Sequence, residues 1–309
     1  MTSILVTGAH GMLGHVVCRV LSRTHRVTGT CRGSEADYPA IDGVEADHFS
    51  LIERVDLADP RNLAERLPAD DIDVVVNCAG LIKQRPEAKN PFAILQANAL
   101  APKRLAQWCD ARGARLIHVS TDCVFSGRRG GYSEEDAPDP VDLYGLSKVL
   151  GEVTAAPHLT LRTSIIGPQL VGQEGLFAWF LAQRGQAVRG YARAIFSGLT
   201  TPAFAHVLKQ IVEAPTPMSG LHHVAAVPIS KYELLCEIDR RLALGVAIER
   251  DEDTVCDRSL DGRRFAEASG IVVPGWEEML DDLCNGQDSE VAAWTATKDR
   301  TTVSPAEAY

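Results

Sequence analysis

Residues 4–14 read ILVTGAHGMLG, a short apolar run followed by Gly8, Gly11 and Gly14. A strand buried on both faces needs such a run, and the apolar positions after Gly14 repeat with a helical period. In the order strand, turn, helix, the first glycine permits a tight turn and the second lets a pyrophosphate approach the backbone, while the third allows close helix–strand packing. The helix N-terminus adds free N–H groups. The stretch predicts a dinucleotide site, although the spacing is G-x-x-G-x-x-G rather than G-x-G-x-x-G; a plain glycine turn is the alternative.

The composition is that of an ordinary globular protein, with 45% hydrophobic and 23% charged residues. A chain of 309 residues allows one large α/β domain, or a large and a small one. The net charge of −10 argues against nucleic-acid binding, which requires a basic face, but it permits a local basic pocket. We therefore expect no nucleic-acid partner, and a small phosphorylated substrate remains compatible.

The N-terminus and the cysteines predict the compartment. No basic segment precedes the first expected strand, so no signal peptide is expected, and no apolar run has the length of a membrane span. The eight cysteines include no C-x-x-C pair, which favours buried free thiols over disulfides or a metal site. These features predict a cytoplasmic protein that binds neither a membrane nor a metal.

Apolar strands alternate with amphipathic helices through the first half of the chain. Strands are expected at 4–6, 26–31, 51–55, 72–77, 116–119 and 159–162. Helices are expected at 12–22, 59–67, 90–112 and 144–153, two of them opening on a cap residue followed by proline. This order predicts an α/β fold, a Rossmann-type doubly wound parallel sheet with right-handed crossovers.

The rhythm changes after Thr163, which suggests a second unit. We expect residues 1–164 to form the Rossmann domain, with 200–214 returning to it, and 165–284 to form a smaller C-terminal α/β lobe that holds the substrate. Residues 126–140 are rich in glycine, proline and acidic side chains and predict a surface loop or lid. Residues 285–309 are polar without a period and predict a flexible tail.

Tyr144 and Lys148, in the stretch YGLSK, stand four residues apart and share a helix face. Tyrosine is a poor acid–base group at neutral pH, and a neighbouring ammonium would lower its pKa. Their helix follows the strand at 116–119, at the sheet edge where open α/β sheets bind ligands. Thr121 ends that strand and can offer a hydroxyl to a carbonyl oxygen beside Tyr144; alternatively, residues 120–122 only form a polar strand end or cap. We expect Thr121, Tyr144 and Lys148 to be catalytic.

Arg32 follows the second expected strand, and the next carboxylate is Glu35. At this place an acidic residue normally binds the ribose of NAD, whereas an arginine suits the 2′-phosphate of NADP. The sequence therefore favours NADP(H), with NAD(H) as the alternative; the other explanation of Arg32 is a solvated surface arginine.

TGAHGMLG at 7–14, VVNCAG at 75–80, Asn98, STD at 120–122 and YGLSK at 144–148 occur in a family order. In these residues the chain resembles the extended short-chain dehydrogenase/reductase family over nearly its whole length, to about Leu283. STDCVFSG at 120–127 and LRTSIIG at 161–167 most resemble the dTDP-4-dehydrorhamnose reductases and their nucleotide-sugar reductase relatives. Those reductases carry a tyrosine where this chain has Cys123 and a tryptophan where it has Ile165.

The resemblance implies hydride transfer from NADPH or NADH to the C4 ketone of a nucleotide-linked deoxysugar, and a homodimer as the family expectation. It implies that Tyr144 donates the proton, Lys148 binds the nicotinamide ribose and Thr121 orients the ketone. The expected cofactor residues are Gly8, Gly11, Met12, Leu13, Gly14, Arg32, Asp56, Leu57, Cys78, Ala79, Gly80, Asn98, Ser120, Tyr144, Lys148 and Thr163.

The expected substrate residues are Thr121, Asp122, Ser164, Arg189 and Arg193. A guanidinium matches phosphate geometry, so Arg189 and Arg193 are candidates to hold the diphosphate, although solvated surface arginines are an equal alternative. Two other functions stay open: a nucleotide-sugar epimerase or dehydratase that retains its NAD, and a non-catalytic dinucleotide-binding subunit.

Overall fold

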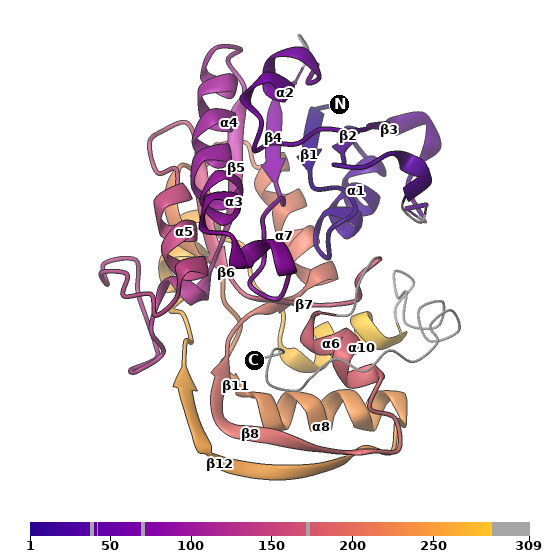
Figure 1. Cartoon of the computed structure of the whole chain (residues 1–309), viewed down its shortest axis with the longest axis vertical. Helices are drawn as coiled ribbons and strands as arrows, with labels where there is room; N and C mark the ends of the chain where they lie inside the picture. The colour runs from indigo at the N-terminus through magenta and orange to yellow at the C-terminus, as the bar shows by residue number, and fades with distance from the viewer. Residues whose placement is uncertain (38–39, 42, 69–71, 171–173, 286–309) are drawn as a thin grey trace.

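The structure, a computed structural model, describes residues 1–37, 40–41, 43–68, 72–170 and 174–285 (Figure 1). The expected tail at 285–309 lies, from residue 286 on, outside the described residues. Among the helices described, none is both long enough and apolar enough to cross a bilayer.

A seven-stranded sheet with the order β10-β6-β5-β4-β1-β2-β3 forms the centre of the molecule. Every neighbouring pair in it is parallel, so all carboxyl ends share one edge. The predicted Rossmann-type doubly wound sheet is therefore confirmed. Its strands are β1 (Ser3–Thr7), β2 (Arg26–Thr30), β3 (Phe49–Ile52), β4 (Val74–Asn77), β5 (Arg115–Thr121), β6 (Leu159–Thr163) and β10 (Gly220–His223).

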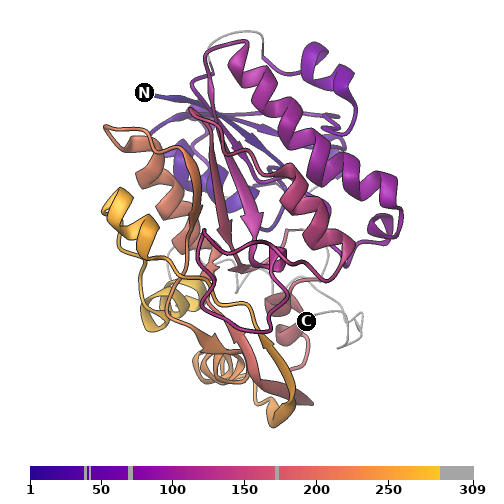
Figure 2. The ribbon, with the colours of Figure 1, turned by 90° about the vertical axis from the view of Figure 1, so that its left-hand side faces the viewer.

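Helices cover both faces of this sheet (Figure 2). Ile4 and Val6 of β1 face one hydrophobic cluster, and Leu5 between them faces another, because successive side chains of a strand point to opposite faces. The first face carries α1 (Gly14–Ser22) and α7 (Thr201–Glu213); the second carries α2 (Pro60–Glu65), α3 (Pro91–Leu95), α4 (Ala101–Asp110) and α5 (Leu143–Gly151). Short helical turns are η1 (Glu35–Asp37), η2 (Ala46–His48), η3 (Pro86–Lys89) and η5 (Asp122–Val124).

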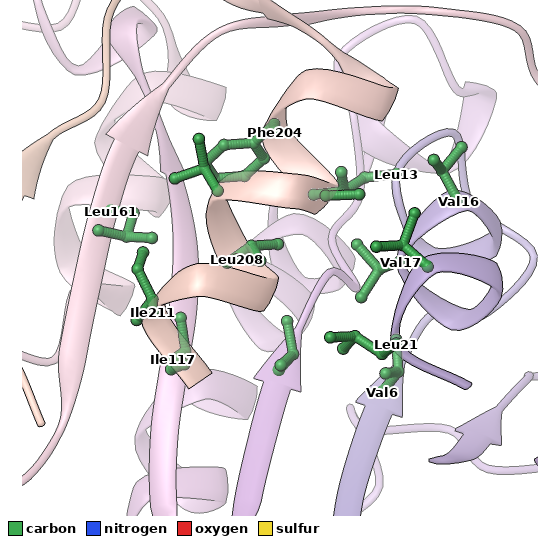
Figure 3. Close-up of a cluster of buried hydrophobic side chains, with 14 of the residues drawn as sticks. Val6, Leu13, Val16, Val17, Leu21, Ile117, Leu161, Phe204, Leu208 and Ile211 are labelled. Atoms are coloured by element: carbon green, nitrogen blue, oxygen red, sulfur yellow. The ribbon is translucent and has the colours of Figure 1, made fainter. Parts of the chain in front are cut away.

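α7 packs against α1 and the large sheet (Figure 3). Phe204, Leu208 and Ile211 recur at the spacing of one helix face and are fully buried, opposite Val17 and Leu21 of α1. Thr200 caps α7 by accepting a hydrogen bond from the Ala203 N–H. The segment therefore completes the large sheet's core, although it follows residues of the smaller lobe in sequence.

The smaller lobe lies below the carboxyl ends of the large sheet (Figure 1). Its three-stranded sheet has β8 (Ala187–Phe196) between β11 (Ile229–Ser230) and β12 (Ala247–Asp257). A second pair joins β7 (Ile165–Ile166) to β9 (Leu199–Thr200). The remaining helices are α6 (Leu176–Leu181), α8 (Lys231–Leu242), α9 (Arg263–Ser269) and α10 (Trp276–Asn285).

The structure differs from the sequence-based expectations in three places. Residues 220–223, expected in the smaller lobe, form β10 and pair with β6 at the edge of the large sheet. The expected helix at 90–112 contains a π-helical turn, η4 (Gln96–Leu100). The expected lid at 126–140 is anchored, because Tyr132 bridges Leu260 and stacks on Phe125 at 4.2 Å between ring centroids. Each difference arises from a contact between residues distant in sequence.

Gly151 allows α5 to meet the π-helical turn. A Cβ at this position would lie 1.9 Å from the carbonyl oxygen of Asn98, whereas a Cβ at Gly275 would meet nothing within 4 Å. We expect Gly151→Ala to lower the unfolding free energy by roughly 1–3 kcal/mol, as overpacking does. Gly275→Ala is the matched control and should change it by less than about 0.5 kcal/mol. Urea unfolding checks both, and equal stability of the two variants would contradict the close approach.

Candidate active site

The glycine turn after β1 depends on two close backbone approaches. Gly8 has φ +75°, and a Cβ there would lie 2.9 Å from Cα of Ala79, at the end of β4. A Cβ at Gly14 would lie only 2.0 Å from the Gly8 carbonyl oxygen. Gly11 donates its N–H to that oxygen at 2.9 Å. The turn therefore holds the start of α1 directly against the end of β1.

The N-terminus of α1 has the features of an anion site. Leu13 precedes the helix without making a side-chain cap, and the first turn contains no acidic residue. Uncapped N–H groups and the helix dipole favour a phosphate at this position. Met12 lies beside Gly175 of the smaller lobe, where a Cβ would come within 2.6 Å of the Met12 methyl carbon. These residues fit a dinucleotide pyrophosphate. The tight turn needs glycine at positions 8 and 14, where a Cβ would collide with the backbone, and it leaves the N–H groups at the start of α1 without a side-chain cap.

The carboxyl end of β4 adjoins this turn. Cys78 donates its N–H to the Thr7 carbonyl, and Ala79 donates to the Asn77 side chain at 3.1 Å. Burial raises the pKa of the Cys78 thiol to about 12, so the thiol stays neutral. Gly80 is exposed. Cys78, Ala79 and Gly80 thus form a small, uncharged surface next to the glycine turn.

Asn98 holds the next residue of this segment in place. Its Oδ1 accepts the Leu81 N–H at 2.7 Å, while its Nδ2 donates to the Leu81 carbonyl and to Ser147 Oγ. Asn98 is only 1% exposed. The expected cofactor residue Asn98 therefore ties the loop after β4 to α5, and its side-chain amide is occupied by protein partners.

Thr121 and Tyr144 meet at the carboxyl end of β5. Thr121 acts to lower the pKa of the Tyr144 phenol against the effect of burial, and Thr121 Oγ1 accepts the Cys123 N–H at 3.1 Å and donates to Asp122 Oδ1 at 3.1 Å. Asp142 caps α5 by accepting the Gly145 N–H at 2.7 Å. A Cβ at Gly145 would lie 2.2 Å from the Cys123 carbonyl oxygen. Glycine after Tyr144 thus allows the start of α5 to reach the strand end.

Lys148 lies one turn further along α5 and is 6% exposed. Its Nζ donates to the Val119 carbonyl at 2.7 Å. Burial lowers the pKa of Lys148 to about 8, although Glu152 opposes this shift. Burial also raises the pKa of Tyr144 above its ordinary value, rather than the lysine lowering it as its spacing suggested. At neutral pH the site therefore holds a protonated phenol and a largely protonated ammonium.

Ser120 and Thr163 take part in the polar interior beside this site. Ser120 Oγ donates to Glu152 at 2.8 Å, and Thr163, paired with Thr121 in register, donates to the Ser164 carbonyl at 3.3 Å. Both expected cofactor residues are buried: Ser120 is 4% exposed and Thr163 is 2% exposed. Ser164 lies next to Thr163, and its carbonyl accepts the Leu199 N–H at 2.8 Å.

Two arginines follow the carboxyl ends of the adjacent strands β2 and β3. Arg32 is exposed after β2, and Arg54 follows β3 with its N–H donated to the Gly33 carbonyl at 2.9 Å. Arg54 has φ +55°, a conformation unusual for a side chain of this size. The sequence pattern pointed to Arg32 and missed Arg54, since the register of two parallel strands was needed to relate them.

Asp56 and Leu57 follow β3. The Asp56 carboxylate accepts the Ala58 N–H at 2.9 Å and so closes its own turn. Leu57 is 8% exposed and packs in the hydrophobic cluster with Leu63 and Val75. Asp56 is exposed at this edge, whereas Leu57 contributes mainly to the core.

The structure separates the expected substrate residues into two groups. Asp122 is buried beside Thr121, and burial raises its pKa. Arg189 and Arg193 instead lie on the exposed face of β8, opposite the face that packs on α8, and Arg189 lies 3.9 Å from Asp251. Arg193 pairs in register with Val255 of β12, and Arg189 pairs with Glu249 further from the Phe196 end of β8.

Other cations converge on Asp122 and Cys123. Arg258, just after β12, donates to the Phe125 carbonyl at 2.9 Å and lies 3.7 Å from Cys123 Sγ. Lys231, the first residue of α8, and Lys83, in the loop after β4, act electrostatically on the same group. Burial lowers the pKa of Lys231 to about 8, while Asp122 opposes the shift. Sequence reasoning missed these cations because they come from three segments with no shared motif.

A buried ion pair extends behind the site. Glu152 accepts two hydrogen bonds from Arg162, at 2.7 and 2.8 Å, and Arg162 lies 3.4 Å from His223 Nε2. Because a carbonyl oxygen can only accept, His223 Nδ1 carries the proton and donates it to the Tyr132 carbonyl at 3.0 Å, which leaves Nε2 to accept from Arg162. Burial, with a smaller effect of Arg162, lowers the pKa of His223 to about 4.

Comparisons with known proteins identify the relatives of the chain. The family model described as the RmlD substrate binding domain matches residues 1–286. The probable low-salt glycan biosynthesis reductase Agl14 of Haloferax volcanii is 39% identical over 149 residues, 48% of this chain and 46% of that protein. Methionine adenosyltransferase 2 subunit beta of Mus musculus is 34% identical over 151 residues, 48% of this chain and 41% of that protein. The matches therefore span less than half of these two relatives.

The fold is shared with a solved structure of similar length. The crystal structure of a hypothetical dTDP-4-dehydrorhamnose reductase from Sulfolobus tokodaii has a TM-score of 0.69 and 26% identity, covering 86% of this chain and 94% of that chain. The resemblance that the motifs suggested is thereby confirmed at the level of family and fold.

The neutral state of His223 predicts a pH dependence of stability. Its pKa is about 4 in the folded protein and 6.5 ordinarily, so the unfolded chain binds the proton first as the pH falls. His223 should stabilise the fold fully above pH 6.5 and lose about 3 kcal/mol as the pH falls to about 4. Urea unfolding of wild type and His223→Gln between these pH values checks this. Parallel pH dependences of the two proteins would contradict it.

Proposed function

Because the chain belongs to the RmlD substrate binding domain family, we propose that it is a nucleotide-sugar reductase that uses NADPH to reduce the 4-keto group of a nucleotide-linked deoxysugar. The observation that carries the proposal is the placement of Tyr144, at the start of α5, beside Thr121 at the carboxyl end of β5. Lys148 stands one turn further along the same helix, with its ammonium held at the Val119 carbonyl. Ketone reduction by this route needs a protonated acid (Tyr144), a hydroxyl beside it (Thr121) and a nearby cation (Lys148).

The cofactor half of the proposal rests on the edge formed by β1, β2 and β4. The uncapped start of α1 and the tight turn at Gly8 and Gly14 suit the pyrophosphate. Arg32 and Arg54, at the ends of neighbouring strands, suit the 2′-phosphate of NADP and favour it over NAD. A nicotinamide bound along this edge would supply the hydride.

The protein's own groups account for the proton. Tyr144 is protonated at neutral pH and can donate to the ketone oxygen as negative charge develops there, while Thr121 orients that oxygen. Lys148 adds positive potential beside the phenol and stabilises the phenolate that remains. One hydride at carbon and one proton at oxygen convert the ketone to the alcohol, and Tyr144 regains its proton from solvent.

The substrate half of the proposal assigns the diphosphate to Lys83, Lys231 and Arg258. These cations surround Asp122 and Cys123 next to Thr121, whereas Arg189 and Arg193 lie on the exposed face of β8. Arg258 is anchored by its bond to the Phe125 carbonyl, which leaves its guanidinium oriented for phosphate. A site with more cations than carboxylates suits a dianionic group.

A non-catalytic dinucleotide-binding subunit is the second candidate, favoured by the similarity to methionine adenosyltransferase 2 subunit beta. Such a subunit would have no need of Thr121 beside Tyr144 or of the buried Lys148, which this chain has. NADPH binding without turnover across a panel of 4-keto nucleotide sugars would support the subunit and overturn the reductase.

Tyr144→Phe tests the proton donor. We expect turnover to fall by a factor of about 10² or more, because the phenol proton is lost, with NADPH affinity little changed. Loss of NADPH absorbance with 4-keto nucleotide sugars measures turnover, and NADPH fluorescence measures binding. Tyr191→Phe, on β8, is the matched control and should leave turnover unchanged. Full turnover in Tyr144→Phe would remove Tyr144 from the reaction, and product formed without net NADPH loss would indicate an epimerase or dehydratase.

Arg258→Met tests the diphosphate assignment. We expect KM for the nucleotide sugar to rise by about 10-fold or more, the effect of one lost charge-assisted hydrogen bond, with a smaller change in kcat. Arg189→Met removes the same charge from the exposed face of β8 and should leave KM unchanged. Steady-state kinetics compares the two variants. A larger rise in KM for Arg189→Met than for Arg258→Met would contradict the assignment of the diphosphate to Arg258 and favour the arginines of β8.

A further inference from the structure

Glu152 is a buried carboxylate to which the proposed reaction assigns no role. It follows Lys148 by four residues and ends α5, where its N–H bonds to the Val149 carbonyl. Its side chain is 7% exposed, which is unusual for glutamate unless the charge is paired. Because Glu152 lies at the end of the helix that carries Lys148, its charge can act on the Lys148 ammonium.

The carboxylate of Glu152 joins two strands of the sheet. Oε1 accepts hydrogen bonds from Ser120 Oγ at 2.8 Å and from Arg162 Nε at 2.7 Å, and Oε2 accepts from Arg162 Nη2 at 2.8 Å. Ser120 immediately precedes Thr121, so the same carboxylate contacts the residue next to the proposed ketone-binding hydroxyl. Glu152 therefore links the end of β5 to α5 and β6 at once.

Arg162 extends the connection to the loop between β5 and α5, which contains Phe125 and Tyr132. Its guanidinium lies over the ring of Phe125, and its Nη1 faces His223. His223 in turn contacts the Tyr132 carbonyl, and the Tyr132 N–H donates to the Ser259 carbonyl at 2.9 Å. The ion pair is therefore held by packing on several sides and cannot easily reorient.

The charged and titratable groups facing Lys148 come from each neighbouring element. Cys78 after β4 is neutral, because burial raises its pKa to about 12, and His118 of β5 is neutral, because burial lowers its pKa. Lys103 of α4 donates to the Glu152 carbonyl and is itself a cation. Glu152 is thus the anion at neutral pH among the groups that stabilise the Lys148 ammonium.

Arg162 and Tyr144 complete these surroundings. Arg162 is a cation bound to Glu152, and Tyr144 is a neutral phenol at neutral pH. Without the carboxylate, Arg162 would be a buried cation without its ion-pair partner, and Lys148 would lose the anion that favours its charge.

We propose that Glu152 is a positioning residue of this site, which is itself held by its ion pair with Arg162, keeps Ser120 and the end of β5 in place, and stabilises the charge of the Lys148 ammonium. This inference deepens the proposed function, on which the role of Lys148 rests. It also makes two opposite predictions. Removal of the Glu152 charge should favour loss of the Lys148 proton, whereas removal of the Arg162 charge should favour its retention.

The experiment measures the charge of Lys148 without substrate or cofactor. Full-length protein with ¹³Cε-labelled lysine is titrated by NMR, and Lys148→Arg identifies the Lys148 signal. We expect Glu152→Gln to lower the midpoint of this signal by about 0.5–1 pH unit, and Arg162→Met to raise it. Glu152→Asp keeps the charge and serves as the matched control, with a midpoint near that of wild type.

The opposite directions separate electrostatic positioning from a merely structural role. A structural role would lower the thermal midpoints of both variants and leave the Lys148 titration unmoved or moved the same way, and either result overturns the proposal. If Glu152→Gln does not fold, a raised midpoint in Arg162→Met supports the proposal and an unraised one overturns it. The alkaline limb of kcat/KM should move with the titration. Shifted titrations in a protein that reduces no ketone would refute the proposed function and leave the role of Glu152 intact.

Discussion

Burial of a parallel sheet on both faces is the constraint on which the site depends. Helical crossovers cover both faces of the sheet and leave its strands parallel, so their carboxyl ends meet at one edge. The glycine turn, the small residues after β4, Thr121 and the end of β6 all lie along that edge. Residues far apart in the chain are thereby assembled at one edge of the sheet.

Close approach of backbone to backbone then brings the helices to that edge. α1 reaches the end of β1 only because Gly14 has no Cβ, and α5 reaches the Cys123 carbonyl only because Gly145 has none. The same device at Gly151 brings the far end of α5 to Asn98. α5 is therefore located at both ends, and Tyr144 and Lys148 lie between two fixed points.

The buried charges of the site follow from this tight packing. Lys148 and Lys231 have lowered pKa values because both are removed from water, and each is partly compensated by a carboxylate, Glu152 and Asp122 respectively. The pKa of each lysine therefore depends on the position of its carboxylate partner. Arg258, which follows β12 of the smaller lobe, reaches the same region and lies 3.7 Å from Cys123 Sγ.

The sequence by itself determined the doubly wound sheet, the glycine turn and the Tyr144–Lys148 helix, because apolar periodicity, glycine spacing and caps are local signals. Only the tertiary structure decided that β10 completes the large sheet, that Asn98 and Ser120 bond to protein groups, and that Arg258 and Lys231 approach Asp122 and Cys123. It also decided the pairing of Glu152 with Arg162. These features depend on strand order and on contacts between distant segments, and a strand's own residues do not encode which neighbour it will meet.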